Sequence, residues 1–201
     1  MQIKIDMCPY EDNEHIFSKE NLELQPGLTV LVGCNGSGKT SLLHQIKQQK
    51  ENSTIIEFNN LINGGRDVKS MAAFENDYAR MATSVISSEG ENINLAFQMF
   101  AKQIGYTISH LETDELYILI DALDSGLSID MIDYIKHFLK NCVLSDASKI
   151  AKTYIIIAAN SYEMVRDEQC LSVSDLSPIQ FKDYEEYRKF ILDSHYYKSC
   201  R

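Results

Sequence analysis

The chain has 201 residues, of which 44% are hydrophobic and 24% are charged, and its formal net charge is −10. This length and composition predict a single globular domain over residues 1–201 and argue against a disordered chain. The negative charge argues against a surface that is wholly adapted to nucleic acids or anionic membranes.

The five cysteines are odd in number and have no CxxC spacing, which argues against a structural zinc site and a disulfide framework. Reduced thiols in a cytosolic compartment fit this pattern better. No stretch has the length of a membrane span, and the N-terminal residues lack an apolar signal-peptide core. We therefore expect a cytoplasmic protein without a membrane span.

The N-terminal residues predict an antiparallel β lead-in. Apolar and polar side chains alternate from Gln2 to Met7, and a second strand-like segment runs from about Ile16 to Leu24. A break at Pro26-Gly27 separates this lead-in from the next strand.

Residues 28–43 read LTVLVGCNGSGKTSLL, in which a buried strand, a glycine-rich loop and a helix to about Gln49 follow one another. This order is typical of a phosphate-binding P-loop. In such a loop, backbone N–H groups and the helix N-terminus surround phosphate oxygens, a lysine reaches the β- and γ-phosphates, and a hydroxyl ligates Mg²⁺. The residues assigned to nucleotide binding are Gly33, Asn35, Gly36, Ser37, Gly38, Lys39, Thr40 and Ser41.

A buried strand from Thr54 to Phe58 precedes a polar, turn-rich loop. Asn59 or Asn60 in this loop is a candidate for positioning water or metal, and an ordinary turn is the alternative. Arg66 would either contact phosphate or be solvated. Spacings of three and four then predict helices over 67–84 and 93–103, with a loop over 105–113. We assign residues 60–105 to a small helical excursion from the domain.

The apolar run from Glu115 to Asp121 predicts a strand that is buried on both faces, as in a parallel sheet. A carboxylate at the carboxyl end of such a strand lies at the ligand crevice of an open α/β sheet. Asp121 and Thr40 are therefore the candidate metal ligands.

A helix from Met131 to about Asn141, a buried strand from Thr153 to Ala159 and a short strand from Cys170 to Val173 follow. The last predicted helix, Lys182 to Asp193, carries Tyr184, Tyr187 and Phe190 at helical spacing, which we interpret as a packing stripe.

Four segments resemble motifs of the ABC-class ATPases, in particular their compact SMC-like and RecF-like heads. GCNGSGKTSLL resembles Walker A, SSEGE (87–91) a variant signature motif, YILID (117–121) Walker B, and DSGLSID (124–130) the D-loop region. The strand that ends at Asn160 corresponds to the switch strand. The resemblance implies a P-loop NTPase fold, with an ABC-like sheet covered by helices on both faces.

The resemblance also implies ATP and Mg²⁺ as cofactors and a head-to-tail homodimer with ATP between the two subunits. In that dimer Ser88 and Gly90 would contact the γ-phosphate held by the partner. Tyr10 or Phe17 would stack on the adenine, with plain strand packing as the alternative.

Three positions depart from the family pattern. Ala122 stands where a glutamate orients the attacking water, Asn160 stands where a histidine ends the switch strand, and the glutamine after the second core strand has no clear match beyond Asn59 or Asn60. Loss of a general base commonly removes about 10²–10⁴-fold of rate. Asp124 is the first candidate to replace the missing carboxylate, and Glu89 or Glu91 of a partner is the second.

Three functions remain open from the sequence. The first is a slow ATPase that dimerises on Mg-ATP, with Asp124 and Asn160 as catalytic residues. The second is a nucleotide-gated module that binds a protein or nucleic-acid partner without turnover, which Ala122 and Asn160 favour. The third is a small-molecule P-loop kinase, in which SSEGE and DSGLSID would have no role.

Overall fold

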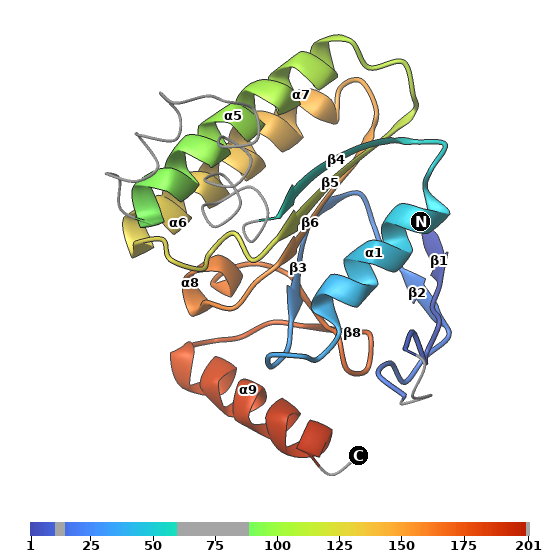
Figure 1. The fold of residues 1–201 in the computed structure, drawn as a ribbon, viewed down its shortest axis with the longest axis vertical. Coiled ribbons are helices and arrows are strands. Elements are labelled where there is room, and N and C mark those ends of the chain that lie inside the picture. Colours follow the sequence, from blue (N-terminus) through green and yellow to red (C-terminus); the bar gives the residue numbers. More distant parts are fainter. Residues whose placement is uncertain (11–14, 60–88, 200–201) are drawn as a thin grey trace, which may run out of the picture.

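A six-stranded sheet runs through the centre of the computed structural model, which describes residues 1–10, 15–59 and 89–199 (Figure 1). The strand order is β4-β5-β6-β3-β7-β8. The first five strands of this order are parallel, and β8 is an antiparallel edge strand. Their bounds are β3 (Gly27–Val32), β4 (Thr54–Asn59), β5 (Glu115–Asp121), β6 (Lys152–Ala158), β7 (Cys170–Ser172) and β8 (Ser177–Ile179).

The central strands are apolar on both faces because helical layers cover both sides of the sheet. Val30 and Ile118 belong to one buried cluster, whereas their neighbours Leu31 and Leu119 belong to the other. This alternation is the period of two expected for strands, and it produces two cores on either side of one sheet.

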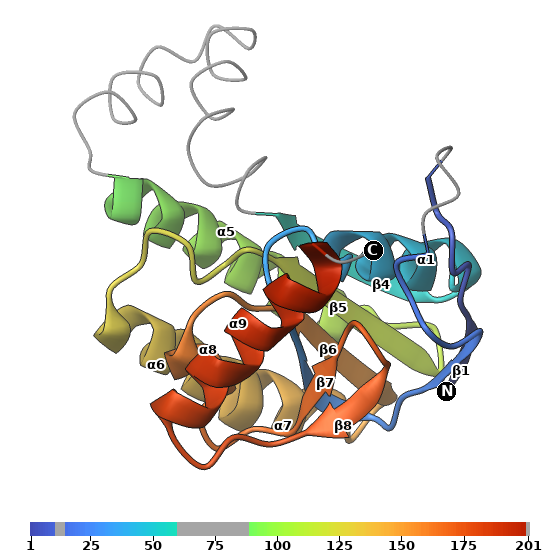
Figure 2. The same ribbon diagram turned by 90° about the horizontal axis from the view of Figure 1, so that it is seen from below.

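Helix α1 covers one face of the sheet, and α5, α6 and α7 cover the other (Figure 1). Helix α9 lies alongside the loop between β3 and α1 in both ribbon views (Figures 1 and 2). The helix bounds are α1 (Lys39–Gln49), α5 (Glu89–Ser109), α6 (Ile129–His137), the π-helix η1 (Phe138–Leu144), α7 (Ser145–Ala147), α8 (Tyr162–Val165) and α9 (Tyr184–Ser199).

A separate two-stranded sheet precedes β3, as the predicted antiparallel lead-in requires. Strand β1 (Gln2–Lys4) pairs with β2 (Asn21–Glu23), so the second strand is much shorter than predicted from residues 16–24. Two glutamines of α1 hold the strand segment against the helix. Gln49 pairs with both the N–H and the C=O of Lys4, and Gln45 does the same with Asp6.

The α/β class, the helices on both faces and the positions of the main strands are confirmed. The predicted loop over 105–113 is wrong at its start, because α5 continues to Ser109 and buries Ile104 in the core. Rings of Phe97 and Phe100 contact Phe58 of β4, at centroid distances of 6.3 and 5.2 Å. Residues 93–105 therefore pack on the sheet rather than leaving it, and the predicted helix over 67–84 lies outside the described residues.

The helix predicted over 131–141 is longer in the structure. It begins at Ile129, and after His137 it continues through η1 and α7 to Ala147. Leu139 and Val143 of the π-helix are both buried, so the wider turn keeps apolar residues on the core side. Sequence patterns did not predict α8 or β8, which are short elements of four and three residues.

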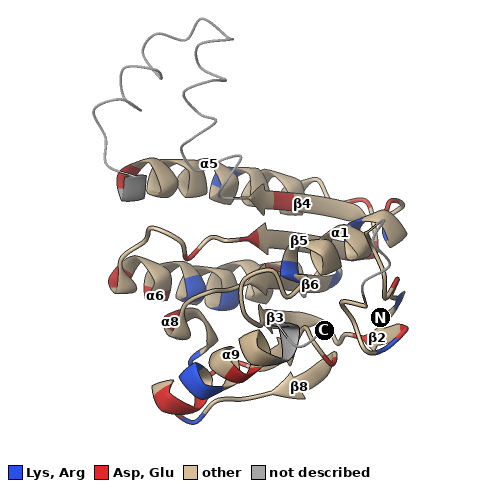
Figure 3. Ribbon diagram, turned by 60° about the horizontal axis from the view of Figure 1, so that its bottom comes forward, with Lys and Arg blue, Asp and Glu red and all other residues tan. Residues whose placement is uncertain are grey.

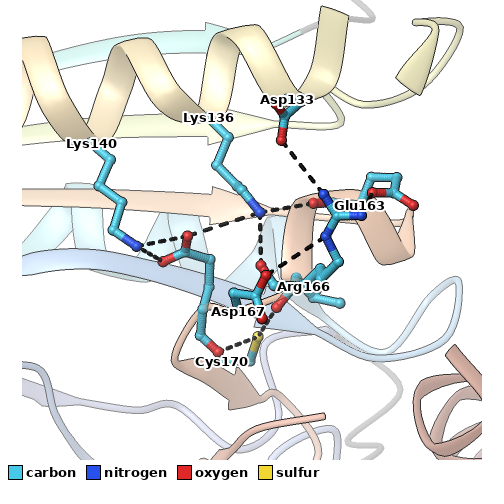
Figure 4. Close-up of polar contacts among 9 residues, drawn as sticks. Asp133, Lys136, Lys140, Glu163, Arg166, Asp167 and Cys170 are labelled. Carbon is cyan, nitrogen blue, oxygen red and sulfur yellow. Dashed lines mark hydrogen bonds and ion pairs between the residues drawn. The ribbon is translucent and has the colours of Figure 1, made fainter. Parts of the chain in front are cut away.

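An ion network around the buried carboxylate of Glu168 joins α6 and η1 to the segment that leads into β7 (Figure 4). The carboxylate of Glu168 is buried and accepts two hydrogen bonds of 2.9 Å from Lys140. Lys136 Nζ donates to the carbonyls of Glu163 and Arg166. These contacts fix the chain from α8 to β7, and burial raises the pKa of the Cys170 thiol, at the start of β7, to about 12.

Two described helices, α6 and α9, carry both basic and acidic residues. Figure 3 shows Lys and Arg on α6 and α9 with Asp and Glu on the same helices. Among the described helices, none is long and apolar enough to cross a membrane.

Candidate functional site

The carboxyl ends of four parallel strands meet at one edge of the sheet. Across this edge Asn59 of β4 pairs with Asp121 of β5, Asp121 with Ala158 of β6, and Ala158 with Leu31 of β3. The glycine-rich loop begins two residues after Leu31, and Asn160 stands two residues after Ala158. The strand order therefore brings the loop, Asp121 and Asn160 together at the crevice where open α/β sheets bind ligands.

Two glycines allow the loop to turn tightly from β3 into α1. A Cβ on Gly33 would collide with the Ser37 side chain, and one on Gly38, whose φ is +97°, would lie 2.6 Å from Ile16 Cγ2 and 3.1 Å from Phe17 Cζ. A side chain at either position would force the loop apart. The loop also contains a buried hydroxyl, that of Ser37, which has no hydrogen-bond partner within the described part of the chain.

Lys39 lies under this loop at the start of α1. Its ammonium group donates hydrogen bonds to the carbonyls of Gly33 at 2.8 Å and Cys34 at 3.2 Å. Burial lowers the pKa of Lys39, and the charges of Cys34, Asp124 and Asp121 oppose this effect. The site thus holds a partly desolvated cation beside the positive end of a helix, an arrangement that favours an anion.

Thr40 and Asp121 form the second half of the site. Thr40 Oγ1 donates to Asp121 Oδ2 at 2.9 Å, and Asn59 Nδ2 donates to the same oxygen at 3.3 Å. A hydroxyl and a carboxylate in contact supply the oxygen ligands that Mg²⁺ prefers. The described residues contain no cluster of three or more His, Cys, Asp or Glu side chains that could hold a metal by themselves. A metal here would need further oxygens from a ligand and from water.

A cavity of about 240 Å³ opens between these groups. Its lining comprises Tyr10, Asn35, Gly36, Gly38, Lys39, Thr40, Ser41, Asp121, Ala122 and Asn160. The structure therefore brings together most of the loop residues assigned from the sequence with both candidate metal ligands. Gly33 and Ser37 shape the loop behind this lining.

A larger cavity of about 680 Å³ adjoins the first one, between α1 and the N-terminal residues. Tyr10, Thr40 and Ser41 line both cavities, and the Tyr10 hydroxyl lies 2.6 Å from Ser41 Oγ. Tyr10 is exposed, whereas Phe17 is buried against Gly38. Of the two aromatics considered for base stacking, Tyr10 is therefore the one that a ligand can reach.

Asp124 contacts the backbone that follows β6. The side chain is buried, and Oδ2 accepts the N–H groups of Asn160 at 2.7 Å and Ser161 at 2.6 Å. Its other oxygen is buried without a partner among the described residues. One oxygen of Asp124 is therefore held by the backbone that follows β6, and its role as a replacement general base stays a prediction.

The residue after Asp121 also has an unusual backbone. Ala122 has φ of +53°, in the left-handed region that non-glycine residues rarely adopt. It lines the cavity with a methyl group where the resembled family carries a carboxylate. Strained backbone of this kind concentrates at functional sites.

The signature-like segment is described only in part. Ser88, Asn60 and Arg66 lie outside the described residues, and Gly90 belongs to the first turn of α5. Gly90 is not among the residues that line this cavity, and the prediction that Ser88 and Gly90 contact a partner's nucleotide stays a prediction. The walls of the cavity are also contacted by two residues of α9 that sequence reasoning missed. Tyr187 contacts Asn160, and Ser194 contacts Cys34. Their only sequence signal is a spacing of seven along one helix.

Comparison with models of known protein families and with curated proteins found no match for this chain. Evidence for the function of this chain therefore lies in the chemistry of the site itself.

Proposed function

We propose that the chain binds a Mg²⁺-nucleoside triphosphate, with ATP as the first candidate, in the cavity at the carboxyl edge of its sheet. The observation that carries this proposal is the contact of 2.9 Å between Thr40 Oγ1 and Asp121 Oδ2, next to the buried ammonium of Lys39. A metal-binding pair and a phosphate-binding cation on the two sides of one loop are the arrangement that nucleotide phosphates require.

Each wall of the cavity has a role in this proposal. Backbone N–H groups from Asn35 to Lys39 and the N-terminus of α1 would surround the phosphates. Lys39 would exchange its contacts with the loop carbonyls for the β- and γ-phosphate oxygens. Thr40 and Asp121 would hold Mg²⁺, which supplies charge neutralisation between the phosphates. Tyr10 would lie beside the base at the mouth of the larger cavity.

Hydrolysis within one chain is expected to be slow. Asp121 is the only carboxylate among the cavity-lining residues that the structure describes, and it faces Thr40. Ala122 cannot accept a proton, and Asp124 is committed to two backbone amides. The side chains present support a site that binds and holds the nucleotide more than one that turns it over rapidly.

We further propose, from the resemblance to ABC-class heads, that Mg-ATP brings two chains together head to tail. In that arrangement the N-terminal turn of α5, with Gly90, would face the partner's nucleotide. The alternative function, a nucleotide-gated module for a protein or nucleic-acid partner, is favoured by the methyl group of Ala122 at the hydrolytic position.

Titration calorimetry with Mg-ATP tests the binding step. We expect Lys39→Ala to weaken binding by about 30-fold or more, since one charge-assisted hydrogen bond contributes about 2 kcal/mol. Lys47→Ala is the matched control, because Lys47 is on the same helix and pairs with Glu57 on the surface. Equal affinities of the two variants would contradict the assigned site.

Light scattering and phosphate release in the same samples separate the three functions. A dimer that forms on Mg-ATP and releases little phosphate supports the gated module, and steady release supports the slow ATPase. A chain that binds ATP but stays monomeric contradicts the head-to-tail dimer and favours the kinase.

A further inference from the structure

We propose that α9 is part of the nucleotide site, with Tyr187 and Ser194 as positioning residues that hold its two walls. This inference rests on the proposed function and extends it to a helix for which the sequence suggested only packing. The two residues are seven positions apart, so they lie on one face of the helix. Figure 2 shows α9 crossing in front of the loop between β3 and α1.

Tyr187 fixes the wall that follows β6. Its hydroxyl donates to the carbonyl of Asn160 at 2.9 Å, while the N–H of Asn160 donates to Asp124 Oδ2 at 2.7 Å. The backbone of Asn160 is therefore held at both polar groups, and its exposed side chain lines the cavity. Burial and the charge of Asp124 raise the pKa of Tyr187 to about 12.

Ser194 fixes the opposite wall. The N–H of Cys34, the second residue of the loop, donates to Ser194 Oγ at 3.1 Å, and this hydroxyl donates to the carbonyl of Ile191 at 2.9 Å. The carbonyl of Cys34 accepts a hydrogen bond from Lys39 Nζ. Cys34 is thus held between α9 and the lysine that is expected to bind phosphate.

Aromatic packing makes α9 a firm support for both contacts. The Tyr187 ring lies 5.3 Å from Phe181 and 5.8 Å from Tyr162, centroid to centroid. Because Lys39 and Asn160 both face the cavity, a nucleotide that rearranges either residue changes the contacts of α9. By linkage, the docking of α9 and the affinity for nucleotide then affect each other by the same factor.

The affinities of three variants for Mg-ATP and Mg-ADP test the inference. We expect Tyr187→Phe to weaken Mg-ATP binding by about five-fold, the effect of about one net hydrogen bond, and to weaken Mg-ADP binding less. We expect this difference because Asn160 follows β6, which neighbours the strand that ends at Asp121, and the terminal phosphate would lie next to the Mg²⁺ that Asp121 is proposed to hold. Ser194→Ala should weaken the binding of Mg-ATP and of Mg-ADP by a similar factor, because the loop would surround all the phosphates.

Tyr184→Phe is the matched control for Tyr187→Phe. Tyr184 is on the same helix and exposed, and its ring packs edge-on against Tyr162. This variant should bind both nucleotides like the wild type. A purely structural role for Tyr187 would lower the unfolding midpoint while leaving the ratio of ATP to ADP affinity unchanged, and that result would overturn the inference.

Hydrogen exchange of α9 amides, with and without Mg-ATP, provides a second readout. We expect nucleotide to change the exchange of α9 in the wild type and in Tyr184→Phe, and to change it less in Ser194→Ala. Wild-type protein that binds Mg-ATP without any change in α9 would refute the role of the helix while leaving the proposed function intact. Wild-type protein that binds no nucleotide would refute both.

Discussion

Replacement of Asp124 by asparagine separates a structural role of this carboxylate from a catalytic one. In the structure Asp124 Oδ2 accepts two backbone N–H groups at 2.7 and 2.6 Å. Asparagine keeps an oxygen in the same place, so both hydrogen bonds persist without the negative charge. A hydrogen bond to a charged group exceeds a neutral one by about 1 kcal/mol, so Asp124→Asn should lower the free energy of unfolding by about 2 kcal/mol.

Urea denaturation measures this loss. With a slope of about 2 kcal/mol per molar urea, the midpoint should fall by about 1 M. Asp146→Asn is the matched control, because Asp146 forms an exposed ion pair with Lys149 and its loss should cost under about 0.5 kcal/mol. The rate of phosphate release by Asp124→Asn, measured without urea, where the variant is folded, should stay within a few-fold of the wild-type rate. An unchanged midpoint together with a loss of phosphate release of about 100-fold would refute the structural role and restore Asp124 as a general base.

Three further predictions concern stability. Gln45→Ala should lower the free energy of unfolding in urea by about 2 kcal/mol, because the two hydrogen bonds to the backbone of Asp6 are lost. Glu168→Gln should lower the free energy of unfolding in urea by about 2 kcal/mol. This loss is smaller than for a fully buried ion pair, because the Lys140 side chain is 46% exposed. A loss no larger than that caused by Lys140→Met would contradict this prediction. Burial raises the pKa of Cys170 from 9.0 to about 12, so the unfolded chain loses this proton first. Stability should therefore fall as the pH rises above about 9, by up to about 1.4 kcal/mol per pH unit, and Cys170→Ala should flatten this dependence.

The glycine-rich loop between β3 and α1 and the main strands could be predicted because their signals are local. A β-branched run, glycines at fixed offsets and a helical repeat lie within residues 28–49, and each constrains its own neighbourhood. The strand predicted from Glu115 to Asp121 has the same bounds in the structure. The proximity of Thr40 and Asp121 was also predictable, because ligands bind at the carboxyl ends of parallel strands.

The roles of Asp124 and α9 could not be read from the sequence because they depend on contacts between distant segments. The spacing of Asp124 from Asp121 suggested a replacement general base. Only the path of the chain after β6 shows that its carboxylate accepts hydrogen bonds from the backbone N–H groups of Asn160 and Ser161. The contact between Ser194 and Cys34 joins residues 160 positions apart. No local pattern encodes such a pair, since it arises from where α9 packs.

The sequence by itself therefore determined the elements and the chemistry of one loop, since periodicity and glycine placement act over a few residues. The tertiary structure decided which side chains surround that loop. By placing β6 between β3 and β5, the sheet puts Asn160 between the loop and Asp121. By packing α9 beside the loop, the fold brings Tyr187 and Ser194 into contact with the backbone of the site.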